Sequence, residues 1–147
     1  EMNPNDRKEL FYQINNDMFI HDRISLDPFF NQDQANKRYI GWVSDELELG
    51  STVFKLVYKD LTIGFFTFRL LDNTNTFVSS LGGLYPSLKK NGFGVCLPFF
   101  SISEGVKRNA KKILIGLSSN NKNSFALHYS FGYNNIESQF YVFVKHK

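Results

Sequence analysis

Three β-rich segments in the middle of the chain constrain the fold most. They are residues 52–58, 62–71 and 76–85, each rich in β-branched and aromatic side chains that favour extended backbone. Lys59-Asp60 and the polar run at 72–75 are short connections between them, so the pattern predicts an antiparallel meander. Gly82-Gly83 lies inside the third segment, where glycines indicate a bulge or the close approach of a ligand or another backbone.

Segments with helical periodicity flank this meander on both sides. The pattern predicts helices at 6–19 and 33–48 before it, then a helix at 93–108, a strand at 112–117, a helix at 121–131 and a strand at 139–145. In the helix at 93–108, one face carries Val95, Phe99, Ile102 and Val106. The order α-α-β-β-β-α-β-α-β predicts an α+β fold with a mixed central sheet and helices on both faces.

Length and composition bound the class of protein. A chain of 147 residues predicts a single domain, residues 1–147, and because it opens on Glu1 we expect an N-terminal portion to be missing. The net charge of +3 is mild and its lysines and arginines are dispersed, which argues against nucleic-acid binding. Cys96 is the single cysteine, no metal spacing is present, and no apolar run reaches membrane-spanning length. We therefore expect a cytoplasmic protein that binds no metal and does not insert into a membrane.

A glycine-rich segment joins the third predicted strand to the following helix. It reads Lys89-Lys90-Asn91-Gly92-Phe93-Gly94. Glycines permit a tight turn that leaves amides unpaired, and a helix N-terminus adds free N–H donors with a partial positive charge. Together these features form a cradle for phosphate oxygens. A tight turn with glycines present for steric reasons alone explains this segment equally well, and the Walker and Rossmann patterns do not fit it.

A second motif follows one predicted helix and one predicted strand later. In the stretch from Asn121 to Tyr133, the residues at matching positions are Asn121, Ser124, Leu127, Gly132 and Tyr133. With the glycine-rich segment, this arrangement resembles the GNAT superfamily of N-acetyltransferases over most of residues 52–147. More loosely, residues 19–28 and 38–42 resemble the acceptor side of nucleotide-sugar N-acetyltransferases of the TDP-fucosamine type.

The resemblance implies an acyl-CoA-dependent enzyme with acetyl-CoA as co-substrate and the amino group of a nucleotide-linked amino sugar as acceptor. It implies that coenzyme A lies against residues of the third strand, the glycine-rich segment and the second motif: Leu84, Lys89, Lys90, Asn91, Gly92, Phe93, Gly94, Val95, Asn121 and Ser124. The substrate-binding residues that it implies are His21, Arg23, Trp42 and Gly82. An amide near Gly82 to Leu84 would stabilise the developing oxyanion. Many such enzymes are dimers, so a homodimer is also allowed.

Two positions depart from the superfamily pattern. Lys89 replaces the usual Gln or Arg and lacks the planar fork of a guanidinium group. His128 occupies the place of the usual general-acid tyrosine, and Tyr129 follows it, so either residue is a candidate proton donor to the thiolate leaving group. As an acid at neutral pH, His128 needs a raised pKa or must first take the proton from the ammonium, and a histidine that only packs on the last helix explains this position equally well. A reaction that needs no side-chain acid is also open. Two alternatives stay open: acetyl transfer to a peptide or another small amine, and a non-catalytic domain that binds acyl-CoA.

Overall fold

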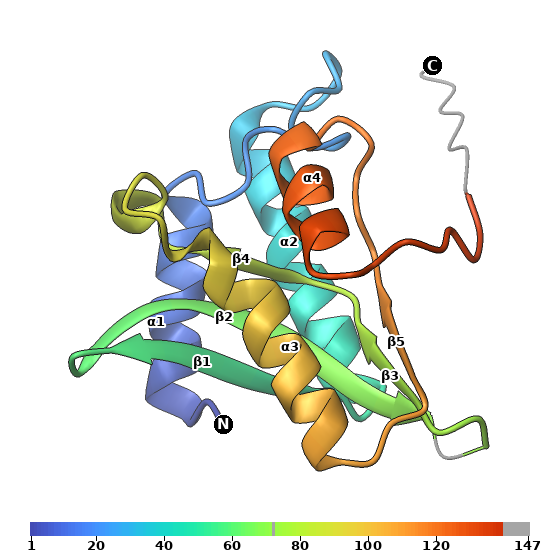
Figure 1. Cartoon of the computed structure of the whole chain (residues 1–147). Helices are drawn as coiled ribbons and strands as arrows, with labels where there is room; N and C mark the ends of the chain where they lie inside the picture. Colours follow the sequence, from blue (N-terminus) through green and yellow to red (C-terminus); the bar gives the residue numbers. More distant parts are fainter. Residues whose placement is uncertain (72, 140–147) are drawn as a thin grey trace.

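The computed structural model describes residues 1–71 and 73–139, and it confirms the α+β architecture. Its helices are α1 (Pro4–Asn15), α2 (Gln32–Glu48), α3 (Cys96–Lys107) and α4 (Lys122–Ser130), with short 3₁₀ turns η1 (Pro86–Leu88) and η2 (Phe93–Val95). Its strands are β1 (Thr52–Tyr58), β2 (Leu61–Leu71), β3 (Thr76–Ser79), β4 (Gly82–Leu84) and β5 (Lys112–Ile115). The helices α1 and α2 cover one face of the sheet and α3 covers the other (Figure 1). The predicted strand at 139–145 lies outside the described residues except for Gln139.

The sheet is mixed because one pair of strands is parallel. The strands β1, β2 and β3 form an antiparallel meander, and β5 pairs with β3 in parallel. The hairpin turn at Lys59 and Asp60 places both residues at positive φ, as a two-residue hairpin turn with the right-handed strand twist requires. The crossover from β4 to β5 runs through α3, which packs on the sheet.

Each face of the sheet has its own apolar core. On the α1–α2 side, Phe65 packs with Leu10, Ile14, Tyr39 and Val43. On the α3 side, the buried residues of the sheet are Leu56, Ile63, Phe66, Phe68, Phe77 and Leu84. The rings of Phe68 and Phe77 stack with centroids 4.9 Å apart. Strand alternation produces this division from Phe65 to Phe68, and the bulge where β1 and β2 shift register puts Ile63 on the same face as Phe66.

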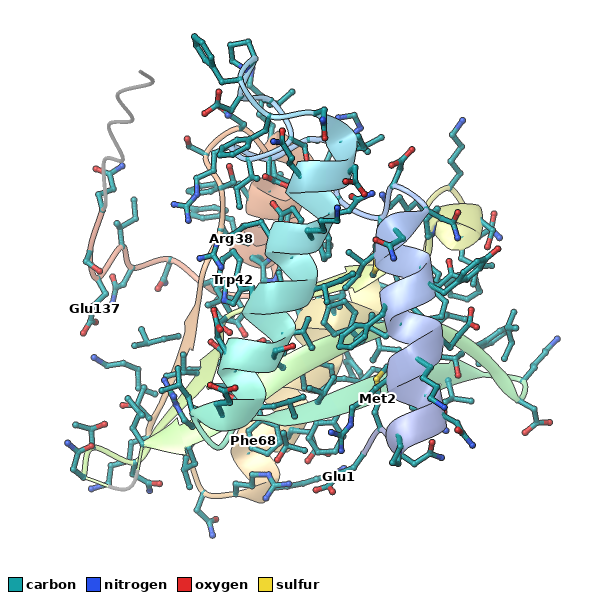
Figure 2. All side chains as sticks on the ribbon, turned by 180° about the vertical axis from the view of Figure 1, so that it is seen from behind. Glu1, Met2, Arg38, Trp42, Phe68 and Glu137 are labelled. Carbon is teal, nitrogen blue, oxygen red and sulfur yellow. The ribbon has the colours of Figure 1, made fainter. Side chains whose placement is uncertain are left out.

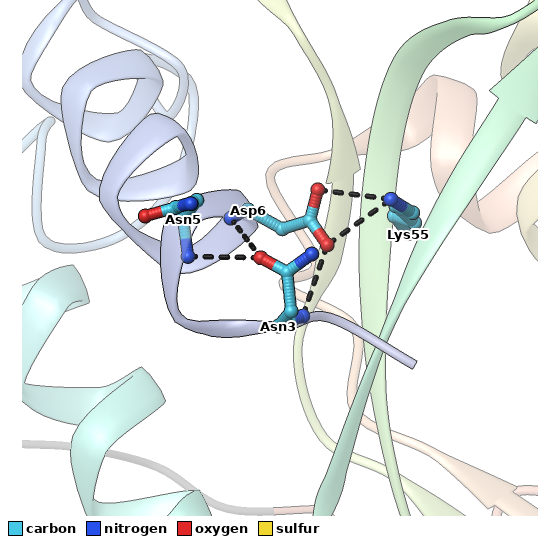
Figure 3. A network of polar contacts seen from close by, with 4 residues as sticks. All are labelled: Asn3, Asn5, Asp6 and Lys55. Atoms are coloured by element: carbon cyan, nitrogen blue, oxygen red, sulfur yellow. Dashed lines mark hydrogen bonds and ion pairs between the residues drawn. The ribbon is translucent and has the colours of Figure 1, made fainter.

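The N-terminus of α1 is fixed to β1 by a polar network (Figure 3). The Asn3 side chain accepts from the amides of Asn5 and Asp6, and the Asp6 carboxylate accepts from the Asn3 amide, forming a capping box. Lys55 Nζ lies 2.9 Å from Asp6 Oδ1. The Asn3 amide, followed by the Lys55 ammonium, lowers the pKa of Asp6.

Two predictions about the elements need correction. The third predicted strand is divided into β3 and β4, because the register against β2 changes at Ser80 and Leu81. Of the residues predicted to share one face of this helix, Val95 of η2 and Phe99 and Val106 of α3 are 49%, 53% and 66% exposed, and Ile102 is half-buried. The sheet instead receives the small or compact residues Pro98, Ser101 and Gly105, which let the helix approach closely.

Candidate functional site

The strands β4 and β5 part at the point where the register changes. The pairing of β5 with β3 ends at Ser79 and Ile115, and the Gly116 amide donates to the Ser79 carbonyl at 3.3 Å. Beyond this bond, β4 pairs with β2, and none of the other described strands pairs with its second edge. One side of β4 is therefore closed by hydrogen bonds and the other is open.

Two backbone amides of β4 face this open edge. The Leu81 carbonyl accepts from Thr67 and the Tyr85 amide donates to Ile63, so these two residues direct their hydrogen-bonding groups to β2. Hydrogen-bonded pairs alternate along an antiparallel ladder, so Gly83 is oriented in the same way. The N–H groups of Gly82 and Leu84, which lie between these residues, point to the edge that β5 leaves unpaired. This arrangement provides the free strand amide predicted near residues 82–84.

Thr67 holds the register change in place. Its Oγ1 accepts from the Leu81 amide at 3.1 Å, lies 3.1 Å from Ser80 Oγ, and is completely buried. The Thr67 hydroxyl therefore accepts the hydrogen bond that the Leu81 amide would otherwise donate to a strand carbonyl. Thr67 is not among the site residues predicted from the sequence. The signal that would have found it is a polar residue within the apolar run Phe65-Phe66-Thr67-Phe68.

The glycine-rich segment forms a turn with free amides. Gly92 has φ of +77°, a conformation that glycine adopts at little cost, and apart from its two chain neighbours no described residue has a heavy atom within 4 Å of the position of a Cβ there. The Asn91 amide donates to the Leu88 carbonyl at 3.2 Å. Among the described residues, the amides of Gly92, Phe93 and Gly94 have no hydrogen-bond acceptor. These three amides, followed by the N-terminus of α3, can receive an anion.

The turn lies beside both β4 and α4. A Cβ on Gly82 would be 3.4 Å from Leu97 Cδ2 in the first turn of α3, and a Cβ on Gly94 would be 3.7 Å from Leu127 Cδ2 of α4. The ring of Phe93 lies 5.0 Å from that of Tyr58. The open edge of β4, the free amides and α4 thus belong to one region of the molecule.

Lys89 and Lys90 differ in the contacts that their side chains make. The Lys89 Nζ donates a hydrogen bond to the Met18 carbonyl, between α1 and α2. Burial lowers the pKa of Lys89, and the neighbouring Asp17 carboxylate opposes that shift. Lys90 and Val95 are exposed at the turn, and the Leu84 side chain is buried in the α3-side core. Both lysines are exposed residues, and they differ because the Lys89 ammonium is held by the Met18 carbonyl.

The predicted coenzyme ligands on α4 are engaged by the helix itself. Asn121 is the N-cap, and its Oδ1 accepts from the Ser124 amide at 3.1 Å. The Ser124 carbonyl lies 2.8 Å from His128 Nδ1, and Ser124 Oγ lies 3.4 Å from the same nitrogen. Capping and intrahelical contacts account for the positions of both side chains.

His128 is 7% exposed, and its ring packs edge-on against Tyr133 at 5.4 Å. Because a carbonyl oxygen only accepts, its contact with Nδ1 places the proton there and leaves a lone pair on Nε2. Burial lowers the pKa of His128, although the Ser124 carbonyl opposes the shift. An imidazolium acid at neutral pH needs the opposite shift. Tyr129 is 64% exposed on the same helix.

The predicted acceptor-side residues lie around a stack of aromatic rings. Phe19 and Tyr39 stack at 4.3 Å, and Tyr39 and Trp42 at 6.2 Å. Arg38 and Trp42 lie on the side of α2 turned away from α1 (Figure 2). His21 and Arg23 are exposed on the preceding connection. Burial, followed by the Asp22 carboxylate, raises the pKa of Tyr39.

A Cβ on the exposed Gly82 would point to the α3 side of the sheet, 3.4 Å from Leu97 Cδ2, whereas a Cβ on Gly83 would be 3.3 Å from the Phe19 ring. The structure therefore brings Gly82, Leu84 and the glycine-rich turn together, and the aromatic stack reaches β4 at Gly83 through Phe19.

Two cavities, of about 240 and 530 Å³, lie elsewhere, between β1 and α3 and between α1 and α2. None of the predicted site residues lines either of them. In the part of the chain that the structure describes, no helix is both long enough and apolar enough to cross a membrane.

No family model and no curated protein matches the sequence. Solved structures do match the fold. The ribosomal-protein-S18-alanine N-acetyltransferase of Escherichia coli has a TM-score of 0.64 at 15% identity, over 92% of this chain and 76% of its own. A Bacillus subtilis acetyltransferase solved with CoA has a TM-score of 0.59 at 20% identity, covering 90% and 70% of the two chains.

A transcriptional regulator of Bacillus halodurans is also similar, with a TM-score of 0.66 at 9% identity over 98% of this chain and 97% of its own. At these identities the likeness establishes the architecture. The chain has the fold found in N-acetyltransferases.

Proposed function

We propose that this protein transfers an acetyl group from acetyl-CoA to a primary amine. The observation that carries the proposal is the open edge of β4, where the Gly82 and Leu84 amides have no partner among the described residues and lie beside a turn with three more such amides. The first set is placed to receive a carbonyl oxygen and the second to receive a phosphate. A thioester joined to a pyrophosphate through a long arm has both groups.

The residues present fit such a substrate. The amides of Gly92, Phe93 and Gly94 would hold the pyrophosphate, with Lys90 adding positive charge. The β4 edge would bind the pantetheine amides as an added strand does, because no described strand pairs with its outward N–H and C=O groups. The Gly82 or Leu84 amide would then donate to the thioester oxygen.

In the chemical step, the neutral amine attacks the thioester carbon, so that a C–N bond forms while the C–S bond breaks. Negative charge develops on the carbonyl oxygen, and a fixed amide stabilises it. The amine loses one proton and the departing thiolate gains one. The exposed Tyr129 hydroxyl is our candidate donor to the thiolate. His128, neutral with its Nε2 lone pair, is suited to orienting the helix or accepting a proton.

For the acceptor, we propose a nucleotide-linked amino sugar. Trp42 offers an aromatic surface, and Arg23 and Arg38 offer cationic groups for phosphate beside Tyr39. A peptide N-terminus is the second candidate, because the Escherichia coli neighbour is named for acetylation of a ribosomal-protein alanine. The third candidate is a non-catalytic domain that binds acyl-CoA, because the Bacillus halodurans protein with a similar structure is named a transcriptional regulator.

Thermal-shift measurements with acetyl-CoA, longer acyl-CoAs and free TDP separate these candidates. Ligand binding raises the melting temperature by mass action, so we expect a rise with acetyl-CoA and a further rise with TDP. A rise with acetyl-CoA and none with TDP favours a peptide or another small amine. No stabilisation by any CoA species rules out both the enzyme and the acyl-CoA sensor.

Turnover is measured as thiol release from acetyl-CoA with panels of amino sugars and alanine-starting peptides. We expect Tyr129→Phe to lower the rate constant for acetyl transfer by about 10²-fold or more, the usual contribution of a proton donor. His128→Phe tests the alternative. If His128→Phe abolishes turnover and Tyr129→Phe does not, the two roles are reversed.

A further inference from the structure

Lys89 belongs to the glycine-rich segment by sequence, but its ammonium contacts another part of the protein. The Nζ donates to the Met18 carbonyl, which lies 71 positions earlier in the chain. The Asp17 carboxylate adds an electrostatic attraction at the same place. A lysine engaged in this way has a partner before any phosphate binds.

The carbonyl that Lys89 holds lies at the base of the acceptor-side connection, residues 17–31. Met18 is 2% exposed, and its Cε lies 3.1 Å from where a Cβ on Gly83 would be. The Phe19 carbonyl accepts from Ser25 Oγ at 2.6 Å and from Gln32 Nε2 at 3.2 Å. The position of Met18 and Phe19 is therefore transmitted to the connection that carries His21 and Arg23.

We propose that Lys89 is a positioning residue that couples the glycine-rich turn to the acceptor-side connection, and that it is not a phosphate ligand. The coupling rests on the proposed function, since it links the acetyl-CoA side to the amine side. When CoA binds, the turn that carries Lys89 loses conformational freedom. The hydrogen bond to Met18 then restricts residues 17–31, so that the acceptor site is ordered by the first substrate.

Lys89→Met tests this because it keeps an aliphatic side chain of similar length and removes the donor. The neighbouring exposed lysine supplies the matched control, Lys90→Met. Amide hydrogen exchange of residues 17–31 is measured in each protein with and without CoA, and CoA affinity is measured by calorimetry. Lys89→Arg restores a charged donor.

In the wild type, we expect CoA to slow exchange in residues 17–31. In Lys89→Met we expect exchange there to be about tenfold faster without CoA, the factor for loss of one charged hydrogen bond, and no longer slowed by CoA. CoA affinity should change less than twofold in this variant. Lys90→Met should weaken CoA binding and keep the wild-type exchange pattern, and Lys89→Arg should recover the response to CoA.

A loss of CoA affinity in Lys89→Met as large as in Lys90→Met, with unchanged exchange in residues 17–31, would overturn the inference and make Lys89 a phosphate ligand. If Lys89→Met does not fold cooperatively, the same measurements on Lys89→Gln decide. The two proposals fail separately. Wild-type protein that binds no CoA defeats the proposed function, whereas unchanged exchange without CoA in Lys89→Met and Lys89→Gln defeats the contact itself.

Discussion

The two edges of β4 differ in how closely a neighbouring backbone approaches them and in whether their amides are paired. On the edge paired with β2, the backbones approach so closely that a Cβ on Gly64 would lie 2.4 Å from the Gly83 carbonyl oxygen. On the other edge, no described residue pairs with the amides, and none of the described atoms would contact a Cβ on the adjoining Gly92. One strand therefore combines a rigid attachment with free donors, and the rigid edge fixes the direction in which the free amides point.

Gly64→Ala breaks the closed edge and should have the largest effect. The clash involves backbone atoms, so the strands must separate, and we expect a loss of about 3 kcal/mol in the free energy of unfolding. Chemical denaturation measures it. Gly116→Ala is the control at the point where β3 and β5 part, because its Cβ would lie an ordinary 3.6 Å from the Ser80 oxygen. Equal stability of the two variants would refute the closed-edge account.

Thr67→Val tests what holds the boundary between the two edges. The change keeps the side-chain shape but leaves the buried Leu81 amide without an acceptor, which should cost about 2 kcal/mol. Thr67→Ser keeps the hydroxyl and should lose less. Thr62→Val on the same strand serves as the control. A Thr67→Val protein as stable as the control would show that the register change does not depend on this hydroxyl.

Gly92→Ala probes the open side, where the cost is conformational and not steric. An alanine at φ of +77° should lower stability by about 1 kcal/mol. Gly94→Ala has no positive φ to maintain, and its Cβ would make an ordinary contact with Leu127, so we expect no loss. Denaturation curves compare the pair. A larger loss in Gly94→Ala would mean that the turn is more tightly packed than described.

The burial of His128 predicts a small pH dependence of stability. Because its pKa is lowered in the folded state, the unfolded chain binds more protons. Stability should therefore fall as the pH drops below about 6.5, with a slope of at most about 1.4 kcal/mol per pH unit for this one proton. His128→Gln should have a shallower slope between pH 7 and 5. Parallel curves for the two proteins would contradict the burial of a neutral imidazole.

The backbone features of the candidate site could be predicted from the sequence. The side-chain contacts could be predicted only in part. The glycines at 82, 83, 92 and 94 indicated a strand irregularity and a turn. Few other residues adopt positive φ or let a neighbouring backbone approach so closely. Thr67 was missed, because its role depends on a partner in another strand. The contact of Lys89 with Met18 could not be predicted from the sequence either, since it joins residues 71 positions apart.

Local chemistry in the sequence determined the helices, the meander and the free amides of the turn, because these depend on neighbouring residues. Tertiary packing decided which face of α3 is buried. The sheet receives Pro98, Ser101 and Gly105 and not the apolar face identified in the sequence, because the layers can approach closely only where side chains are small. Packing also set the parting of β4 from β5, since a register change exists only between strands that have already paired.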